Sequence, residues 1–341
     1  MRIGKILVIL LVISINTFAN ANYIKVGSEY KWAGYADAKI TLKVIDQDGE
    51  PVSGATVKGW LFNSRYKNVR REYKGLTDAK GMYVIEGRTS NDLDLRIEKD
   101  GYYFTRGEYD FRASAPAGKK AVVDGKWQPW NPTKTIVLKE KKNPIPMYAK
   151  SVSTTCPERG KPVGYDLLVG DWVAPYGKGE VSDFVFTVEG EYNAPANKWT
   201  RMTLGFSNSV DGVQEFKSDA LKGQSELMSG YLAPTNGYMN IYDYRMIVLP
   251  DLEKRINVFP RKDMHFYFRI RTQTDDEGKI INAYYGKIYG DITASFRGFG
   301  EKKEIGVYFK YYLNPTPNDR NVEYKVRSNL FKGRDNYIGE P

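Results

Sequence analysis

The 341-residue sequence predicts an all-β protein made of two domains. Apolar residues recur at every second position in many short segments, and tight-turn motifs rich in Asp, Gly and Pro separate those segments. Alternation with period two is typical of a strand that buries one face, and short strands divided by such turns favour stacked sheets. The length exceeds that of one typical domain of ~100 to 200 residues, so we expect two.

The first domain is predicted from the segments between residues 40 and 104. Residues 40–45 (ITLKVI) place apolar side chains on one face of a strand. The turn DQDGEP at residues 46–51 follows, because Asp caps its own backbone and Gly accepts a positive φ. The same order of strand and turn repeats through TDAKG at residues 77–81 and EKDG at residues 98–101, which favours a β-sandwich.

Four of these segments, in this order, resemble the carboxypeptidase-regulatory-like domain. They are LKVID, GEPVSGATV, TDAKGMY and LRIEKDGY, at residues 42–46, 49–57, 77–83 and 95–102. The resemblance covers about residues 38–140. It implies a transthyretin-like (prealbumin-like) or Ig-like β-sandwich that stabilises, spaces or docks other modules and contributes no catalysis of its own.

Two insertions depart from that family's pattern, around residues 63–73 and in the long loop 113–132. The loop carries Trp127 and Trp130 beside two prolines. Exposed tryptophans on a stiff loop could stack on sugar rings or anchor a partner, since aromatic residues dominate binding energy at interfaces. The alternative is that they cover the end of the sandwich or the seam with the next domain.

A charged, proline-containing linker at residues 141–146 is expected to act as an extended spacer before a second domain at residues 147–341. Alternation there predicts a larger antiparallel β-sandwich or jelly-roll-like domain of no recognised family. Residues 215–229 could hold one or two helical turns. The clearest strands are expected at residues 184–188, 202–206, 264–271, 284–294 and 305–313, the last three forming an antiparallel meander.

Residues 1–21 have the layout of a secretory signal peptide, followed by an N-terminal segment at residues 22–37. Arg2 and Lys5 precede an apolar run, and Ala19 and Ala21 provide the small residues of a cleavage site. The run is shorter than the ~20 residues that span a bilayer. We therefore expect a secreted, periplasmic or cell-surface protein with no transmembrane segment after signal removal.

Charge and cysteine content limit the partners. The formal net charge is +10, or +8 after the two basic residues of the signal leave (10 − 2), and the cations are scattered among acidic residues. No nucleic-acid partner is expected; a surface polysaccharide or a protein partner fits this balance. The single cysteine, Cys156, excludes an internal disulfide and is interpreted as a small, half-buried apolar side chain.

The residues that support common active sites are few. His265 is the only histidine and is expected opposite Met264, Phe266 and Phe268, where an outward or partly covered strand residue lies, with no nucleophile motif nearby. One His and one Cys cannot supply the ligands of a zinc site. The acidic turns at residues 46–49 and 275–278 lack the full calcium-loop pattern and are interpreted as turns. No cofactor and no metal are expected.

The remaining candidate site is a tyrosine-rich segment. Tyr238 and Tyr242, with Asp243 and Arg245 as polar contacts, could line a sugar-binding cleft, although tyrosines also suit half-buried strands. We expect an exported, non-enzymatic binding or structural module. The alternatives are a carbohydrate-active hydrolase, which needs two carboxyls facing each other in an open cleft, and a self-associating surface assembly, which needs an exposed strand edge.

Overall fold

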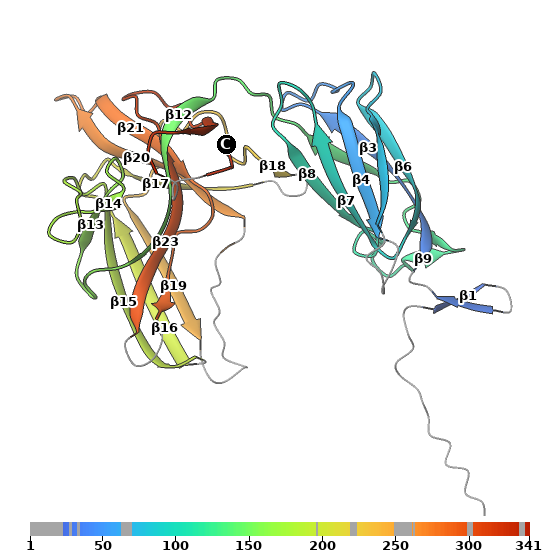
Figure 1. Ribbon diagram of the computed structural model, residues 1–341, viewed down its shortest axis with the longest axis horizontal. Coiled ribbons are helices and arrows are strands. Elements are labelled where there is room, and N and C mark those ends of the chain that lie inside the picture. Colours follow the sequence, from blue (N-terminus) through green and yellow to red (C-terminus); the bar gives the residue numbers. More distant parts are fainter. Residues whose placement is uncertain are drawn as a thin grey trace, which may run out of the picture.

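The computed structural model shows two all-β lobes (Figure 1). It describes residues 23–26, 29–32, 35–62, 70–195, 197–218, 224–248, 261, 263–298, 303–333 and 338–341. Within these ranges the chain forms strands and turns without a helix, which confirms the predicted fold class. The same ranges contain no helix long and apolar enough to cross a membrane. The predicted signal peptide lies outside the described residues.

The first lobe is a sandwich of two sheets. In one sheet the central strand β3 (Ala36–Ile45) pairs antiparallel with β6 (Met82–Thr89) and parallel with β11 (Thr133–Val137) and β10 (Lys126–Trp127), and β9 (Val122–Val123) flanks β10. The facing sheet has the order β18 (Gln224–Ser225), β8 (Thr105–Asp110), β7 (Asp92–Glu98), β4 (Thr56–Phe62) and β5 (Arg70–Leu76). A separate hairpin joins β1 (Tyr23–Val26) and β2 (Glu29–Trp32).

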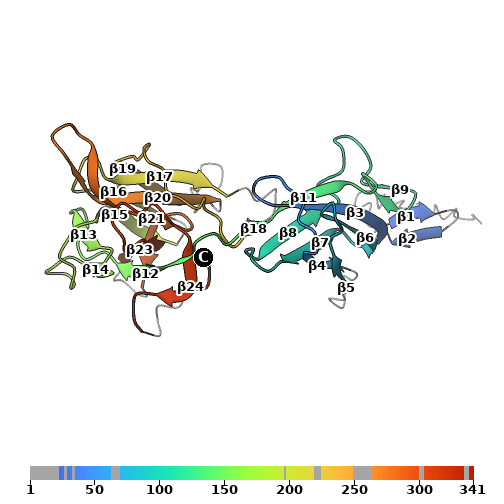
Figure 2. The same ribbon diagram turned by 90° about the horizontal axis from the view of Figure 1, so that it is seen from above.

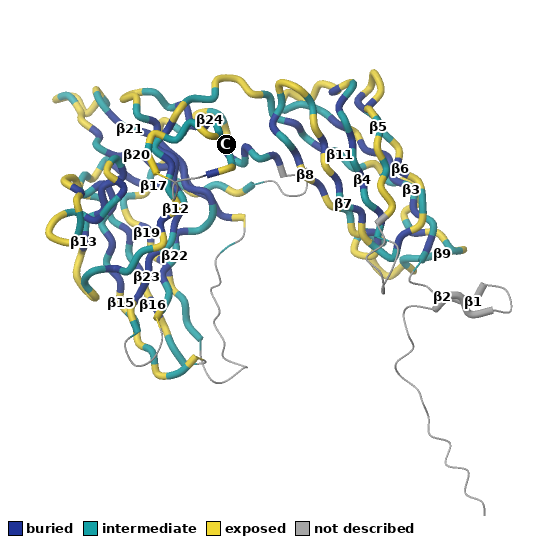
Figure 3. Tube along the Cα trace, in the orientation of Figure 1, coloured by how far each residue is buried: buried dark blue, intermediate teal, exposed yellow. Residues whose placement is uncertain are grey.

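The core of this lobe follows directly from the alternating sequence. On β3 the side chains of Ile40, Leu42 and Val44 are buried, as predicted, and face apolar residues of β4 and β7. Figure 3 shows buried residues along the strands of both lobes. Burial of such side chains contributes roughly 1.5–3 kcal/mol each, which makes the space between the sheets the main source of stability.

Three turns of the same chemistry connect consecutive strands, two in the first lobe and one in the second. In each, an Asp carboxylate accepts hydrogen bonds from the backbone amides two and four residues later, at 2.8–3.1 Å. A glycine with positive φ occupies the fourth position of each turn. The aspartates are Asp46, Asp78 and Asp275. The interpretation of the two acidic sequence motifs as turns is therefore confirmed, because one carboxylate oxygen of each leading aspartate is bound to the turn itself.

The second lobe also stacks two sheets. The larger has the order β17 (Gly212–Lys217), β20 (Met264–Thr274), β21 (Ile280–Ile288), β23 (Glu304–Leu313), β12 (Ile145–Thr155) and β24 (Tyr324–Asn329), with β22 (Thr293–Arg297) also paired to β23. The other has the order β14 (Asp171–Trp172), β13 (Val163–Asp166), β15 (Phe184–Ala194), β16 (Asn197–Gly205) and β19 (Ile241–Val248).

Aromatic side chains fill the space between these two sheets. Phe184 lies 5.5 Å from Phe268 and 5.8 Å from Phe309 between ring centroids, so rings from both sheets interdigitate. On β23 the side chains expected to share one face all belong to this core, which confirms the predicted alternation. They are Ile305, Val307, Phe309, Tyr311 and Leu313.

The strand predictions for this lobe hold with three corrections. The antiparallel series β20, β21, β23 confirms the expected meander. The single strand expected at residues 284–294 is two strands, because the chain turns at Gly290, where φ is +85°. The one or two helical turns expected within residues 215–229 are absent from the described part of this segment, where residues 215–217 belong to β17 and residues 224–225 to β18, since strand pairing outweighs local propensity. Strand β12 begins at Ile145, inside the expected linker.

One strand crosses between the lobes. Strand β18, the next strand after β17 in the sequence, pairs antiparallel with β8 at the edge of the first lobe (Figures 1 and 2). A further backbone bond, from the Glu226 amide to the Phe104 carbonyl at 2.9 Å, extends this pairing. The first lobe therefore completes its sheet with residues that lie more than one hundred positions away in the sequence.

Candidate functional site

The two tryptophans of the long loop have different environments. Trp127 is buried, and its indole Nε1 donates to the Thr89 carbonyl at 3.1 Å. It therefore closes the end of the first core, as the packing interpretation expects, and its ring is not available for stacking on a ligand. Trp130 is 37% exposed and has the Lys126 ammonium 5.0 Å from its ring centroid.

The tyrosine-rich segment does not form one cleft. Tyr242 is buried and donates its hydroxyl to Asp291 at 2.8 Å, whereas Asp243 and Arg245 alternate to the outer face of β19. There the Asp243 carboxylate accepts bonds from Arg201 and Arg245. Tyr238 precedes the strand and bonds back to the carbonyl of Pro234. Only Asp243 and Arg245 are brought together, and a ligand role for the four residues stays a prediction.

His265 is 3% exposed, so it is more deeply buried than the outward or partly covered position expected from alternation alone. Strand β20 is covered on both faces, because Phe216 stacks on the imidazole at 5.2 Å while the opposite side chains enter the main core. The imidazole Nδ1 accepts from the Gly290 amide at 2.9 Å, so in the neutral ring Nε2 carries the proton and faces Ser218 Oγ at 3.3 Å. That tautomer cannot remove the hydroxyl proton of Ser218.

Stability should depend on pH through this histidine. Burial lowers the pKa of His265 from its ordinary value of 6.5 to about 4. The unfolded chain then binds the proton first, so the contribution is fully present above pH 6.5 and declines as the pH falls toward 4. Urea unfolding should show a loss of roughly 2–3 kcal/mol across this window from His265. His265→Asn, which keeps an acceptor for Gly290, should remove that part of the slope; an unchanged slope would contradict the assignment.

A buried ion cluster fixes the loops of the smaller sheet. The Arg271 guanidinium donates to Asp183 at 2.7 and 2.9 Å and to Asp166 at 2.9 Å, and both carboxylates are almost completely buried. The remaining acceptor positions of these carboxylates are used by backbone amides of residues 167, 168, 169, 180 and 181. Both carboxylates are thus bound to protein donors, an arrangement suited to holding loops rather than to proton transfer.

The seam between the lobes is organised by one carboxylate, which we call the Glu323 latch. Glu323 is 1% exposed and accepts the hydroxyl of Tyr103, from the first lobe, at 2.7 Å. It also accepts the backbone amides of Lys142 and Asn143 at 2.9 and 2.6 Å. Burial and the carboxylate together raise the pKa of Tyr103, so the phenol keeps the proton that it donates. One side chain of the second lobe thereby binds both the linker and the first lobe.

The expected spacer, residues 141–146, is therefore held by backbone hydrogen bonds to both lobes. Its other amides also have acceptors: that of Lys141 bonds to the Gly101 carbonyl at 2.7 Å, and that of Ile145 to the Glu323 carbonyl at 2.9 Å. Tyr231 donates to the Glu140 carbonyl at 2.8 Å. The charged, proline-containing composition predicts an extended spacer, and acceptors from both lobes bind the backbone amides of this segment.

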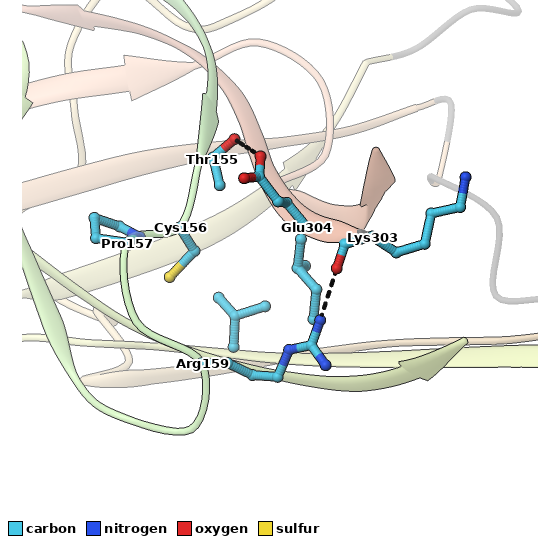
Figure 4. A pocket seen from close by; sticks show the side chains of 8 residues that line it. Thr155, Cys156, Pro157, Arg159, Lys303 and Glu304 are labelled. Atoms are coloured by element: carbon cyan, nitrogen blue, oxygen red, sulfur yellow. Dashed lines mark hydrogen bonds between the residues drawn. The ribbon is translucent and has the colours of Figure 1, made fainter. Parts of the chain in front are cut away.

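A pocket of about 400 Å³ lies in the second lobe, where β12 ends and β23 begins (Figure 4). Arg159 reaches across it to the Lys303 carbonyl at 3.0 Å, and Thr155 donates to the Glu304 carboxylate at 3.1 Å on the other rim. We call this the Cys156 pocket. Its lining consists of Thr155, Cys156, Pro157, Arg159, Val188, Lys303, Glu304 and Ile305.

Sequence reasoning missed both the Glu323 latch and the Cys156 pocket. Glu323 lies in the segment NVEYK, which has no motif, and its partners are 180 to 220 residues away in the chain. The only local signal of a buried carboxylate was that Glu323 stands between two large, mainly apolar residues, Val322 and Tyr324. The pocket combines the end of β12 with the start of β23, so its residues become neighbours only through long-range pairing.

Comparisons with known proteins are sparse. No protein-family model matches the sequence and no curated protein matches it. Among solved structures, hydroxyquinol 1,2-dioxygenase from Pseudomonas putida DLL-E4 is 15% identical over 31% of this chain and 57% of that chain, with a TM-score of 0.22. The shaft pilin SpaA from Lactobacillus rhamnosus GG is 11% identical over 78% and 92%, with a TM-score of 0.22. The pilin BcpA from Bacillus cereus is 11% identical over 80% and 95%, also at 0.22.

These similarities are too weak to support an argument about fold or activity. The chain spans just over half the length of the dioxygenase that it matches. The fold class therefore rests on the strands and sheets of this chain, and the carboxypeptidase-regulatory-like resemblance of residues 38–140 stays a prediction.

Proposed function

We propose that this chain is an exported, non-enzymatic structural and binding protein in which the first lobe is a rigid spacer held against the second. The observation that carries the proposal is the Glu323 latch, a buried carboxylate that binds Tyr103 and two linker amides at once. Hydrogen bonds to a charged, buried acceptor contribute roughly 1.5–3 kcal/mol each, so separating the lobes is costly.

Further contacts across the seam support rigidity. Strand β18 adds to the edge of the first lobe, and the Lys139 ammonium donates to the Ser229 carbonyl at 2.9 Å. The Lys142 ammonium lies 4.7 Å from the ring centroid of Tyr231. Lobes that reorient freely have small, polar contact areas, whereas this seam combines strand pairing with buried hydrogen bonds. Such a unit would present a binding surface at a fixed distance and angle from its attachment.

The export half of the proposal is tested by cell fractionation. Expressed with residues 1–21 in a bacterium, the protein should reach the periplasm or the medium, and mass spectrometry should find Asn22 as the new N-terminus. Without residues 1–21 it should remain in the cytoplasm. An uncleaved protein that stays in the cytoplasmic fraction would refute export by this segment.

The oligomeric state distinguishes a spacer from a component of a self-associating assembly. The edge strand β5 carries the charged residues Arg71, Glu72 and Lys74, and charged side chains on an edge oppose pairing with another chain. We therefore expect a monomer by light scattering across the micromolar range. Concentration-dependent filaments or large oligomers would favour the assembly.

A further inference from the structure

We propose that the Cys156 pocket binds the C-terminal carboxylate of a peptide that ends in a small aliphatic residue. This inference does not depend on the spacer function, because the pocket lies on the second lobe away from the Glu323 latch. It rests on three features: a preorganised guanidinium, an aliphatic floor and an acceptor on the opposite rim.

Arg159 is the expected anchor for the carboxylate. Its guanidinium donates to the Lys303 and Gly190 carbonyls at 3.0 and 3.5 Å and lies 5.6 Å from the ring centroid of Phe296. These contacts fix its position but use only two of its five N–H donors. A guanidinium held in this way can bind a carboxylate through two parallel hydrogen bonds at a low entropic cost.

Two acidic side chains, Glu158 beside Arg159 in the sequence and Glu304 in the pocket lining, have other partners. Glu158 pairs with Lys161 at 3.5 Å, and Glu304 accepts the hydroxyl of Thr155. Lys303 adds positive charge nearby, with its ammonium 5.1 Å from the ring centroid of Tyr192. Arg159 therefore has no carboxylate partner among the described residues and can pair with an incoming anion.

The floor of the pocket favours an aliphatic side chain over a sugar ring. It consists of Cys156, Val188 and Ile305, each at most 9% exposed, and no aromatic ring lines it. The nearby ring of Phe296 has its face covered by the Arg159 guanidinium. Sugars usually stack on an open aromatic face, whereas a methyl or isopropyl group gains from contact with aliphatic carbon and sulfur.

Glu304 completes the match to a peptide end. Its carboxylate lies across the pocket from Arg159 and keeps acceptor capacity beyond the bond from Thr155 (Figure 4). A peptide that places its carboxylate on Arg159 presents an amide N–H as a donor toward the opposite rim. The volume of about 400 Å³ is within the range of small-ligand sites, so it suits a terminal residue or two.

The unique cysteine provides the assay. Cys156 is the only thiol in the sequence and lies in the pocket floor, so a bound ligand should shield it from alkylation by iodoacetamide. Burial raises the pKa of this thiol, so labelling is followed at alkaline pH by mass spectrometry of the intact protein. The probes are N-acetyl-Ala-Ala and its C-terminal amide, which differ only in the charged group.

We expect the acid to slow alkylation several-fold at saturating concentration and the amide to have no effect. Arg159→Gln should abolish the protection, whereas Arg112→Gln, an exposed arginine of the first lobe, should leave it unchanged. Calorimetric titration with the same two probes gives an independent readout and should show saturable heat for the acid alone.

Three results would overturn the inference: equal protection by acid and amide, protection that survives Arg159→Gln, or no binding of the acid by either method. Protection by oligogalacturonate but not by the peptide acid would assign the pocket to an acidic sugar instead. None of these results bears on the Glu323 latch, so the two proposals can fail separately.

Discussion

Glu323→Ala is expected to destabilise the protein by roughly 3–5 kcal/mol and to uncouple its lobes. The substitution removes the acceptor of three buried donors, the Tyr103 hydroxyl and the amides of Lys142 and Asn143. Each buried donor left without a partner costs about 1–3 kcal/mol. Because these donors belong to the linker and the first lobe, the loss falls on the seam rather than on either core.

Scanning calorimetry measures both effects. The original protein should unfold in one transition, and Glu323→Ala in two, with the lower one shifted by several degrees or more. Glu86→Ala is the matched control, since Glu86 pairs with Lys39 at 2.7 Å but is largely exposed, and an exposed pair contributes at most about 1 kcal/mol. A single, barely shifted transition for Glu323→Ala would show that the latch does not couple the lobes.

Arg271→Met should destabilise the second lobe by a similar amount, roughly 3–5 kcal/mol. Methionine fills much of the volume of arginine but leaves Asp166 and Asp183 buried without their cation. Removing one member of a buried ion cluster is costly because the remaining charges stay desolvated. The loops that these carboxylates hold, between β13 and β15, should loosen first.

Urea unfolding at neutral pH tests this expectation against a surface counterpart. Arg201 makes the same contact with Asp243 through two hydrogen bonds, at 3.0 and 3.2 Å. Both of these side chains are more than one-third exposed, at 45% and 34%. Arg201→Met should therefore cost less than about 1 kcal/mol. Equal losses for the two substitutions would mean that burial of the Arg271 cluster is not what makes it stabilising.

The features that local chemistry determines were predictable from the sequence. Alternation placed the odd-numbered side chains of residues 305–313 in the core, and the Asp-x-x-Gly segments beginning at Asp46, Asp78 and Asp275 form the expected turns. In both cases the signal lies within a few residues, because strand faces and turn hydrogen bonds are short-range properties.

The features that depend on distant partners were not predictable. His265 alternates with core residues and was expected to lie outward or partly covered, but Phe216 on the neighbouring strand packs against it and leaves it buried. Trp127 enters the first core, whereas Trp130, three residues later, stays partly exposed. Alternation gives the side of a strand on which a residue lies, and it does not show whether neighbouring side chains cover that side.

The candidate site illustrates the same limit. Asp243 and Arg245 were expected beside Tyr242, yet period two separates them across the sheet, with Tyr242 inside and the charged pair outside. Glu323 and Arg159, which carry the two proposals, sit in segments with no motif. Their roles arise from partners on other strands, which a single sequence does not identify.

Hydrogen–deuterium exchange of the linker tests the central claim, that the two lobes form one locked unit. The amides of Lys141, Lys142, Asn143 and Ile145 all donate to acceptors within the protein, so a peptide spanning residues 140–146 should exchange slowly, like the sheet strands around it. Exchange as fast as that of an unstructured peptide would contradict the lock and leave two lobes joined by a flexible tether.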